Sequence, residues 1–404
     1  MLNDFYDGQF YEDGAGHLRF NSEYVGPIDL PVGTTDCSYM FSGCEIKVGC
    51  YLRHFDTCNV TNMESMFENA KIGRGFTLGV AFDTRNVVNM HGMFASCEVY
   101  GDFTLGGLFD TSKVEDMSGM FYEFRLEGEC KRLDLGYRFN TKNAKAMNYM
   151  FSGVYAPDGV YLGTEFNTSE VVSMSNMFYK THIPKDFSLG ESFDTHNVKN
   201  MSSMFENAVI PEGFSLGSKF DTTKVICADS MFKDANIPAN FTLGEHFDTS
   251  SMLTCESMFA YARIGENVSL GSNFDVGKVQ KICSMFEGTE IGKGFHLGKA
   301  SPLHEHVCWT DIFYKCRIPE DFYFPKEWTP AVERINAHDF EFDIPEGGEP
   351  FRENKYLKQF WSKERGVWDW IACDDEEEIA DMLARVEAME LPTKEECLSQ
   401  LAEL

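Results

Sequence analysis

The chain has 404 residues, 43% of them hydrophobic, and a formal net charge of −29 at pH 7. A chain of this length can bury a sizeable core, whereas its negative charge would repel nucleic acid phosphates. No run of eighteen apolar residues is present, so no transmembrane helix is predicted. We therefore expect a soluble protein that contacts neither a membrane nor nucleic acid directly.

Residues 1–33 precede the repeats and are expected to form an N-terminal cap. They contain neither a basic segment nor an apolar core at their start, so they do not predict a signal peptide. The thirteen cysteines follow no metal-finger or CxxC spacing, and several fall at apolar positions. These features predict reduced thiols and a cytoplasmic protein, in the host cell cytoplasm if a phage encodes it.

A Met-Phe pair recurs along residues 34–324, which we predict to be one repeat region. The phenylalanines are 26, 27, 27 and 30 residues apart at first, and 27 residues apart after that. The pairs end at Phe41, Phe67, Phe94, Phe121, Phe151, Phe178, Phe205, Phe232, Phe259 and Phe286, and an Ile-Phe pair ends at Phe313. Eleven units of about 27 residues are therefore predicted, and the one long step contains a three-residue insertion.

Each unit has two halves with different apolar patterns. In the first half, apolar residues occur at every third position, as at Val198, Met201 and Met204, which indicates a tight turn or an irregular arc. In the second half, an F-x-L-G segment such as 214–217 alternates in the manner of a short strand, with glycine at a turn. The Ser or Thr between Phe and Leu is expected to face outward, in a hydroxyl stripe on an exposed parallel sheet. Neither half can bury its apolar side alone, so the pattern predicts a β-rich repeat solenoid with one continuous core.

The units "FDTSKVEDMSGMF" and "FDTHNVKNMSSMF" resemble the repeat of the BspA-like leucine-rich-repeat group of bacterial surface proteins, F-x-T-S-x-V-x-x-M-x-x-M-F. The resemblance covers about residues 34–324. It implies a right-handed, leucine-rich-repeat-like coil that binds proteins, and it carries over no catalytic residues. Two features differ from the family. Its members are often secreted or lipid-anchored, whereas no signal peptide is predicted here. In addition, F-x-L-G replaces their leucine-rich segment.

Residues 325–404 lack the repeat and carry a net charge of −12. The sequence predicts that they form a small mixed α/β cap over the last coil, or alternatively a separate partner-binding segment. A helix is expected after the acidic run 374–378, because carboxylates at a helix N-terminus favour the helix dipole.

Several residues are of types that could perform chemistry, but their patterns favour structural roles. An Asp recurs at the F-D-T corner, as at Asp83 and Asp110, but the nonapeptide of calcium-binding β-rolls is missing, which favours an Asx turn. The segment "HEHVCW" has no second ligand pair after it, which favours a structural or exposed role. The sequence contains no nucleophile elbow, P-loop or dinucleotide fingerprint. We therefore expect no enzyme activity, no metal and no cofactor.

The expected function is the binding of a protein by the solenoid surface. The first form is an intracellular inhibitor or sequestering protein, encoded by a phage or mobile element, whose acidic surface blocks a basic, nucleic-acid-handling partner. The alternative is a bacterial surface adhesin of the BspA-like type that interacts with a host. A third form, an enzyme with an unusual site in residues 325–404, is disfavoured. The sequence does not predict the oligomeric state.

The candidate partner-binding residues are exposed repeat positions that vary between units, together with aromatic and acidic residues of the C-terminal segment. In the repeats these are Arg85, Asn86, Glu115, Asp116, Lys142, Lys145, His196, Lys199 and Lys224. In the C-terminal segment they are Trp361, Trp368, Trp370, Asp374, Asp375, Glu376, Glu377 and Glu378.

Overall fold

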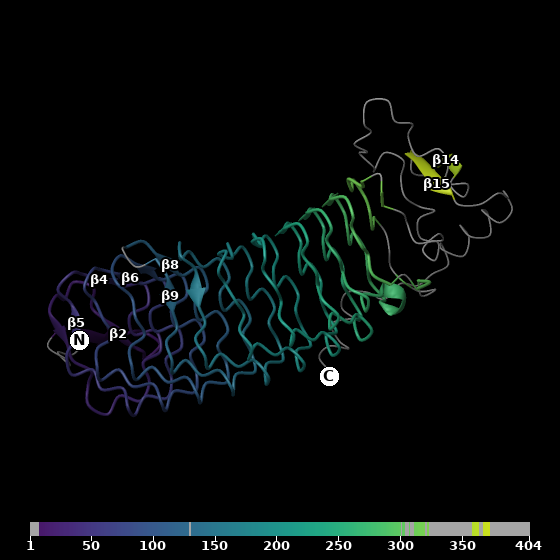
Figure 1. Ribbon diagram of the computed structural model, residues 1–404. Coiled ribbons are helices and arrows are strands. Elements are labelled where there is room, and N and C mark those ends of the chain that lie inside the picture. The colour runs from purple at the N-terminus through teal and green to yellow at the C-terminus, as the bar shows by residue number, and fades with distance from the viewer. Residues whose placement is uncertain are drawn as a thin grey trace. The chain divides into compact units, whose positions relative to one another are not determined.

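The computed structural model describes residues 8–128, 131–299, 301–303, 307, 311–319 and 321–322, and the backbone of residues 358–362 and 367–371. The chain divides into two compact units, Met1–Val198 (unit 1) and Lys199–Leu404 (unit 2). Within each unit, parallel pairing joins residues about 27 positions apart, so that successive coils lie side by side (Figure 1). Each unit is therefore a β-solenoid, as the repeat predicts. The described residues of the two units contain one helical element, the 3-10 turn η1 (Val276–Lys278) of unit 2.

Unit 1 begins with an antiparallel hairpin and continues with short parallel strands. The hairpin pairs β1 (Phe10–Glu12) with β2 (Leu18–Phe20). The parallel strands are β3 (Pro27–Ile28), β4 (Glu45–Ile46), β5 (Tyr51–Leu52), β6 (Lys71–Ile72), β7 (Glu98–Val99), β8 (Arg125–Leu126), β9 (Leu133–Asp134) and β10 (Val160–Tyr161). They form one sheet in the order β4-β6-β7-β8 and the separate pairs β3-β5 and β9-β10. The ring of Phe20 packs on that of Phe41 with centroids 5.0 Å apart, so the hairpin covers the first coil.

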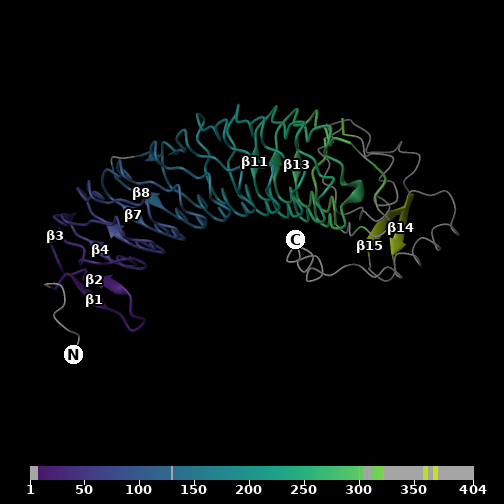
Figure 2. The same ribbon diagram turned by 90° about the horizontal axis from the view of Figure 1, so that it is seen from below.

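Unit 2 contains one parallel sheet and one hairpin. The sheet has the order β11 (Asn236–Ile237), β12 (Arg263–Ile264) and β13 (Glu290–Ile291), and Figure 2 shows β11 and β13 on nearby coils. The hairpin pairs β14 (Lys358–Ser362) with β15 (Val367–Ile371), within the segment predicted to be a C-terminal cap. The helix predicted after the acidic run 374–378 lies outside the described residues.

Along the Met-Phe segment, backbone N–H groups alternate between two kinds of partner. Phe121 N–H donates to the carbonyl oxygen of Met150 on the next coil at 3.0 Å, whereas Met120 N–H donates to Met117 in its own coil at 3.2 Å. Gly119, which lies between Met117 and Met120, has a φ of 62°. The segment is an irregular arc, as predicted, and it satisfies its backbone groups without a regular strand.

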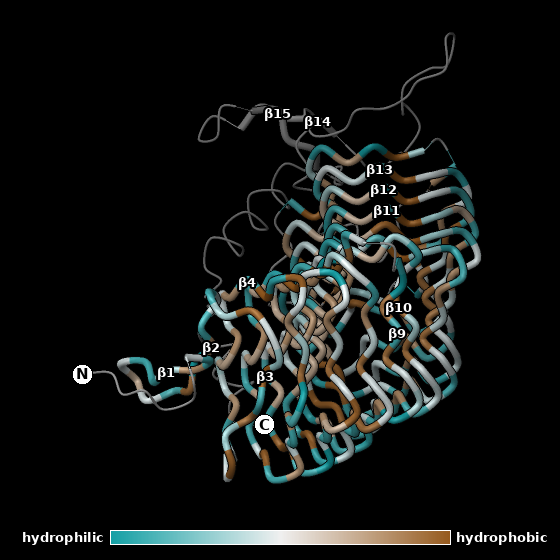
Figure 3. Tube along the Cα trace, turned by 90° about the vertical axis from the view of Figure 1, so that its left-hand side faces the viewer, coloured by the Kyte–Doolittle hydropathy of each residue, from teal (hydrophilic) through white to brown (hydrophobic). Residues whose placement is uncertain are grey.

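Two columns of phenylalanine run through the core of each unit, and a hydrophobic band recurs at matching positions of successive coils (Figure 3). In the Met-Phe column, Phe121 stacks on Phe151 with centroids 5.9 Å apart, and Phe205 stacks on Phe232 at 5.4 Å. Phe205 is 0% exposed, which confirms its predicted burial. The second column consists of Phe55, Phe82, Phe109, Phe139, Phe166 and Phe193 in unit 1 and Phe220, Phe247 and Phe274 in unit 2.

The F-D-T corner is an Asx turn, as predicted. Asn167 Oδ1 accepts a hydrogen bond from the N–H of Ser169, two residues later, at 2.9 Å. The same bond recurs at Asp56, Asp83, Asp110, Asn140, Asp194, Asp221, Asp248 and Asp275. The glycine of F-x-L-G has positive φ throughout, from 77° at Gly79 to 92° at Gly298, which confirms the predicted turn conformation.

The position of the paired strands differs in part from the prediction. The two main sheets lie at the residue pair that ends in Ile, Val or Leu, such as Lys71–Ile72. The pair β9-β10 and the bridges from Ser269 to Thr242 and His296 do lie at F-x-L-G or its equivalent, as predicted. In residues 76–78 and 103–105, Phe and Leu are buried and Thr is exposed, yet no strand forms there. The alternating pattern therefore predicts which side chains are buried on every coil, but it predicts backbone pairing on only some of them.

The cysteines also differ in part from the prediction. Eight described cysteines are free, and seven of these are buried. Cys283, however, is disulfide-bonded, which contradicts the expectation that all thirteen are reduced. A disulfide requires two Cβ atoms at about 3.8 Å, and sequence spacing alone cannot reveal such an approach.

Candidate protein-binding surface

The first group of candidate residues follows the corner threonine. Arg85, Lys142 and His196 occupy this same position on three coils of unit 1, where Arg85 and Lys142 are exposed and His196 is half-buried. Arg85 Nε donates to Asp83 Oδ2 at 2.7 Å, and this contact lowers the pKa of the Asp83 carboxyl. His196 Nδ1 lies 2.8 Å from Asp194 Oδ1. Two of the three side chains are thus paired with their own corner carboxylate.

A second group lies on the neighbouring positions of the arc. Lys145 Nζ lies 3.0 Å from Glu115 Oε2 on the preceding coil, and Asp116 Oδ2 lies 3.8 Å from His91 Nδ1. In unit 2, Lys224 is exposed and Lys199 is half-buried. Exposed ion pairs of this kind contribute little to stability, so these side chains are available for a partner at small cost.

The candidates of the C-terminal segment are only partly described. Trp361 lies on β14 opposite Trp368 on β15, and Trp370 lies opposite Gln359. The acidic run 374–378 lies outside the described residues. Its role in binding therefore stays a prediction.

The structure brings together a set of exposed residues that the sequence interpretation missed. The Arg125 guanidinium lies over the ring of Tyr155 at 4.7 Å, and that of Arg132 lies over Tyr161 at 5.5 Å. We call these four residues the Arg–Tyr surface. A signal was present in the sequence, because Tyr161 stands where most units have Ser or Thr.

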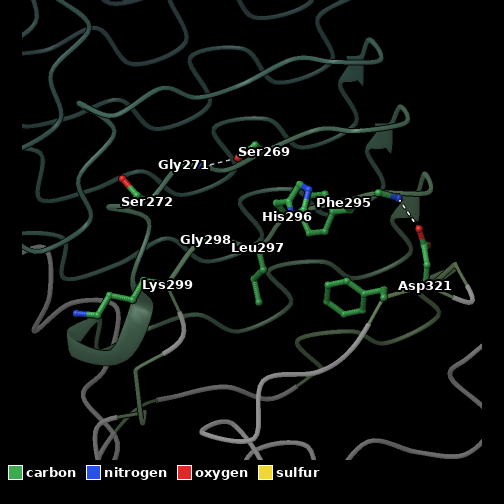
Figure 4. A pocket seen from close by; sticks show the side chains of 11 residues that line it. Ser269, Gly271, Ser272, Phe295, His296, Leu297, Gly298, Lys299 and Asp321 are labelled. Atoms are coloured by element: carbon green, nitrogen blue, oxygen red, sulfur yellow. Dashed lines mark hydrogen bonds between the residues drawn. The ribbon is translucent and has the colours of Figure 1, made fainter.

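A cavity of about 780 Å³ lies at the last described coils of unit 2 (Figure 4). Asp321 accepts the N–H of Gly294 at 2.8 Å, and Ser269 Oγ accepts the N–H of Gly271 at 3.2 Å. Both hydrogen bonds go to backbone N–H groups, so these two polar side chains hold the coil. We assign no chemistry to this cavity.

The described residues contain no group of three or more His, Cys, Asp or Glu side chains arranged to hold a metal ion. Nor does any helix there have the length and apolar character that crossing a membrane requires.

The repeat is shared with a known family. The family model described as "Mycoplasma protein of unknown function, DUF285" matches residues 35–162, 134–242, 163–266 and 191–294. Together these stretches cover more than half of the chain. The chain belongs to this family. The DUF285 matches overlap because several consecutive coils fit the model in more than one position along the repeats. Neither curated proteins nor solved structures give a match.

Proposed function

We propose that this chain is a non-enzymatic, protein-binding solenoid. The observation that carries the proposal is the division of each coil into fixed and free positions. Buried Phe, Met and Thr recur in most units, whereas positions that are exposed or half-buried change chemistry from coil to coil, as Arg85, Lys142 and His196 show. Exposed positions that packing does not constrain are where repeat proteins encode recognition.

A finer form of this proposal is an inhibitor or sequestering protein that acts inside the cell. Its support is the net charge of −29. A long acidic surface raises the rate of association with a basic groove and competes with nucleic acid for it. In this form the partner is a basic, nucleic-acid-handling protein, and a phage or mobile element encodes the chain.

Capture from cell lysate on the immobilised full-length chain tests both levels of the proposal. Captures are compared with and without nuclease, and at low and high salt. We expect a protein to be retained, and its retention to weaken at high salt because the Debye length shortens. Absence of any specific protein would contradict the binding function. Retention that neither salt nor added nucleic acid reduces would contradict the inhibitor form alone.

The second candidate function is a surface adhesin, and the resemblance of "FDTHNVKNMSSMF" to the BspA-like repeat supports it. An adhesin must be exposed on intact cells, whereas an intracellular inhibitor must not. Labelling of intact cells with a membrane-impermeant amine reagent distinguishes the two. Labelled chain supports the adhesin, and chain that is labelled only after lysis supports the inhibitor.

A further inference from the structure

One tyrosine of unit 1 adopts a backbone conformation that tyrosine disfavours. Tyr149 has a φ of 58°, in the left-handed region, where any Cβ costs free energy and a bulky side chain is rare. The equivalent residues of other coils are mostly small or carry an amide, namely Ser65, Gly92, Gly119, Asn176, Ser203, Ser230, Ser257 and Ser284. An outlier of this kind points to a role beyond the fold.

The first coil also has a tyrosine at this position, and there the fold accounts for it. The Tyr39 hydroxyl donates to Glu64 Oε1 at 2.9 Å, and the Tyr39 ring lies 4.9 Å from that of His17. The Tyr149 hydroxyl bonds to none of the residues that the structure describes, and Tyr149 is 43% exposed. The fold therefore does not explain a tyrosine at position 149.

Tyr149 belongs to a group of three tyrosines on three successive coils. Its ring meets that of Tyr122, on the preceding coil, edge to face with centroids 6.1 Å apart. Tyr179, on the following coil, stands at the position of Tyr122. The small residues Ser152 and Gly153 lie between them, and their N–H groups donate to the carbonyl oxygens of Tyr149 at 3.2 Å and Tyr179 at 2.7 Å. We call Tyr122, Tyr149 and Tyr179 the tyrosine cluster.

The charges next to the tyrosine cluster balance one another. Glu123 follows Tyr122, Lys180 follows Tyr179, and both side chains are exposed. Lys180 Nζ lies 5.0 Å from the ring centroid of Tyr179. The pKa of Lys180 is raised, first by Tyr179 and also by the Glu123 carboxylate, so the two charges interact. Since neither sign is in excess here, the cluster is matched to an uncharged occupant.

The amide beside Tyr149 presents donors but no acceptor. Asn148 Oδ1 accepts from Ser173 Oγ at 2.5 Å, and from the N–H and Oγ of Ser175 at 3.1 and 2.8 Å. The bond from the Ser175 N–H fixes the orientation of this amide, because a backbone N–H can only donate. The Nδ2 group of Asn148 has no partner among the described residues. An occupant that offers acceptors and brings few donors therefore fits best.

We propose that the tyrosine cluster binds a proline-rich segment of a protein partner. Such a segment presents uncharged rings, and its prolines have carbonyl acceptors but no N–H donors. Aromatic side chains line the surfaces that bind such segments, whose preformed polyproline II shape lowers the entropic cost of binding. Tyrosine also supplies a large contact area with little loss of side-chain entropy. The inference rests on the proposed protein-binding function and names the chemistry of the partner's contacting segment.

An oligosaccharide is the strongest rival occupant, because it is also uncharged and has apolar faces that can stack on a ring. Each of its hydroxyl groups, however, is a donor as well as an acceptor. Those donors would need acceptors at the site, and the Oδ1 atom of Asn148 already accepts three hydrogen bonds. The observed hydrogen bonds thus favour the proline-rich segment.

Titration with a purified peptide tests the assignment. A fluorescent, uncharged Pro-Pro-Ala repeat peptide is titrated with the full-length chain, beside a Gly-Ser-Ala peptide of equal length. We expect the proline peptide to bind more tightly. Equal affinity for the two peptides, no binding of either, or tighter binding of an Arg-Gly peptide overturns the proposal. Displacement of the proline peptide by a neutral oligosaccharide also overturns it.

The variant Tyr149→Ser separates a binding role from a structural one. Serine occupies this position in other coils, so the variant should be at least as stable as the wild type in urea denaturation. Its affinity for the proline peptide should fall at least about tenfold, as on loss of an aromatic hot spot. Reduced stability with unchanged affinity overturns the inference.

The matched control is Tyr39→Ser, at the same position of the first coil. This variant should be less stable, because Tyr39 bonds to Glu64, and it should bind the proline peptide like the wild type. Equal losses of affinity in Tyr39→Ser and Tyr149→Ser would place the peptide elsewhere and overturn the assignment to the tyrosine cluster.

Capture from cell lysate distinguishes failure of this inference from failure of the proposed function. We expect the wild-type chain to retain a protein with a proline-rich segment, and Tyr149→Ser to retain much less of it. If both retain the same protein equally, the tyrosine cluster is not the contact, and the proposed function stands. If the wild-type chain retains no specific protein, the proposed function itself fails.

Discussion

Thr168 and Asp194, on neighbouring coils of unit 1, exchange two hydrogen bonds through one hydroxyl group. Thr168 Oγ1 donates to the carbonyl oxygen of Asp194 at 2.8 Å and accepts from the N–H of Asp194 at 2.7 Å. Thr168 is fully buried, so no water is at hand to replace the hydroxyl. A column of such threonines joins the corners of successive coils. This is why the F-D-T segment keeps its threonine while the residue after it varies.

Replacement of this hydroxyl should be costly. Thr168→Val preserves the shape of the side chain but leaves a buried N–H and C=O unsatisfied. We expect the free energy of unfolding to fall by about 1–3 kcal/mol, measured by urea denaturation. Thr168→Ser retains the hydroxyl and should lose less. A valine variant as stable as the wild type would show that the hydroxyl ladder is dispensable.

The stability of the protein should be equally sensitive to truncation of a phenylalanine in the Met-Phe column. Phe205 is fully buried and stacks on Phe232 at 5.4 Å. Phe205→Ala empties an aromatic site between coils and should cost about 3–5 kcal/mol. Val80→Ala is the matched control, because Val80 is 94% exposed. If Phe205→Ala lowers the free energy of unfolding only slightly, the neighbouring coils must move to fill the space left by the ring.

Some residues of the arc adopt a conformation that favours glycine. Ser65 has a φ of 49°, and the equivalent residues of the next two coils are Gly92 and Gly119, with φ of 59° and 62°. Ser65→Gly should therefore raise the free energy of unfolding by up to about 1 kcal/mol. Thr77→Gly, at a residue without positive φ, should lower it by about 0.5–1 kcal/mol. Destabilisation by Ser65→Gly would indicate that the serine side chain makes the larger contribution.

The Asp83–Arg85 contact should make stability depend on pH. The pKa of Asp83 is lowered in the folded protein, first by its hydrogen bond to Arg85. Its contribution is therefore present above the unfolded pKa of about 3.9 and is lost as pH falls through the folded pKa. Arg85→Gln should cost less than about 1 kcal/mol at pH 7, because the arginine is exposed. The difference from wild type should shrink as the pH falls below about 3.9. A difference that persists there would indicate a packing effect.

Thiol titration should distinguish buried, exposed and bonded cysteines. Burial raises the pKa of Cys37 to about 12 and that of Cys227 to about 11, so both should react slowly in the native protein near pH 8. Thirteen cysteines include Cys283 and its disulfide partner. The denatured, unreduced protein should therefore show at most eleven thiols, and thirteen after reduction. Recovery of all thirteen without reductant would contradict the disulfide.

The sequence predicted the core well because one period governs it. The Met-Phe pair recurs at 27 residues in most steps, both Met204 and Phe205 are buried, and Phe205 stacks on its counterpart Phe232. The Arg–Tyr surface was not predicted, because Arg125 meets Tyr155 only through the register between two coils of unequal length. The strand pairing at Lys71–Ile72 was not predicted for a similar reason, because backbone hydrogen bonds between coils do not alter the hydropathy pattern. Whether Arg85 and the other variable residues contact a partner stays a prediction.

The uniform joints between coils have a consequence for how such chains change during evolution. In unit 2, Phe232, Phe259 and Phe286 stack at 5.5 and 5.2 Å, so each coil presents its neighbour with nearly the same surface. Loss or duplication of 27 residues would rejoin two matching ends, whereas loss of a single residue would shift every later column out of line. Coil number is thus a modular trait, which a gene can lengthen or shorten in whole steps while the interior chemistry stays as it was.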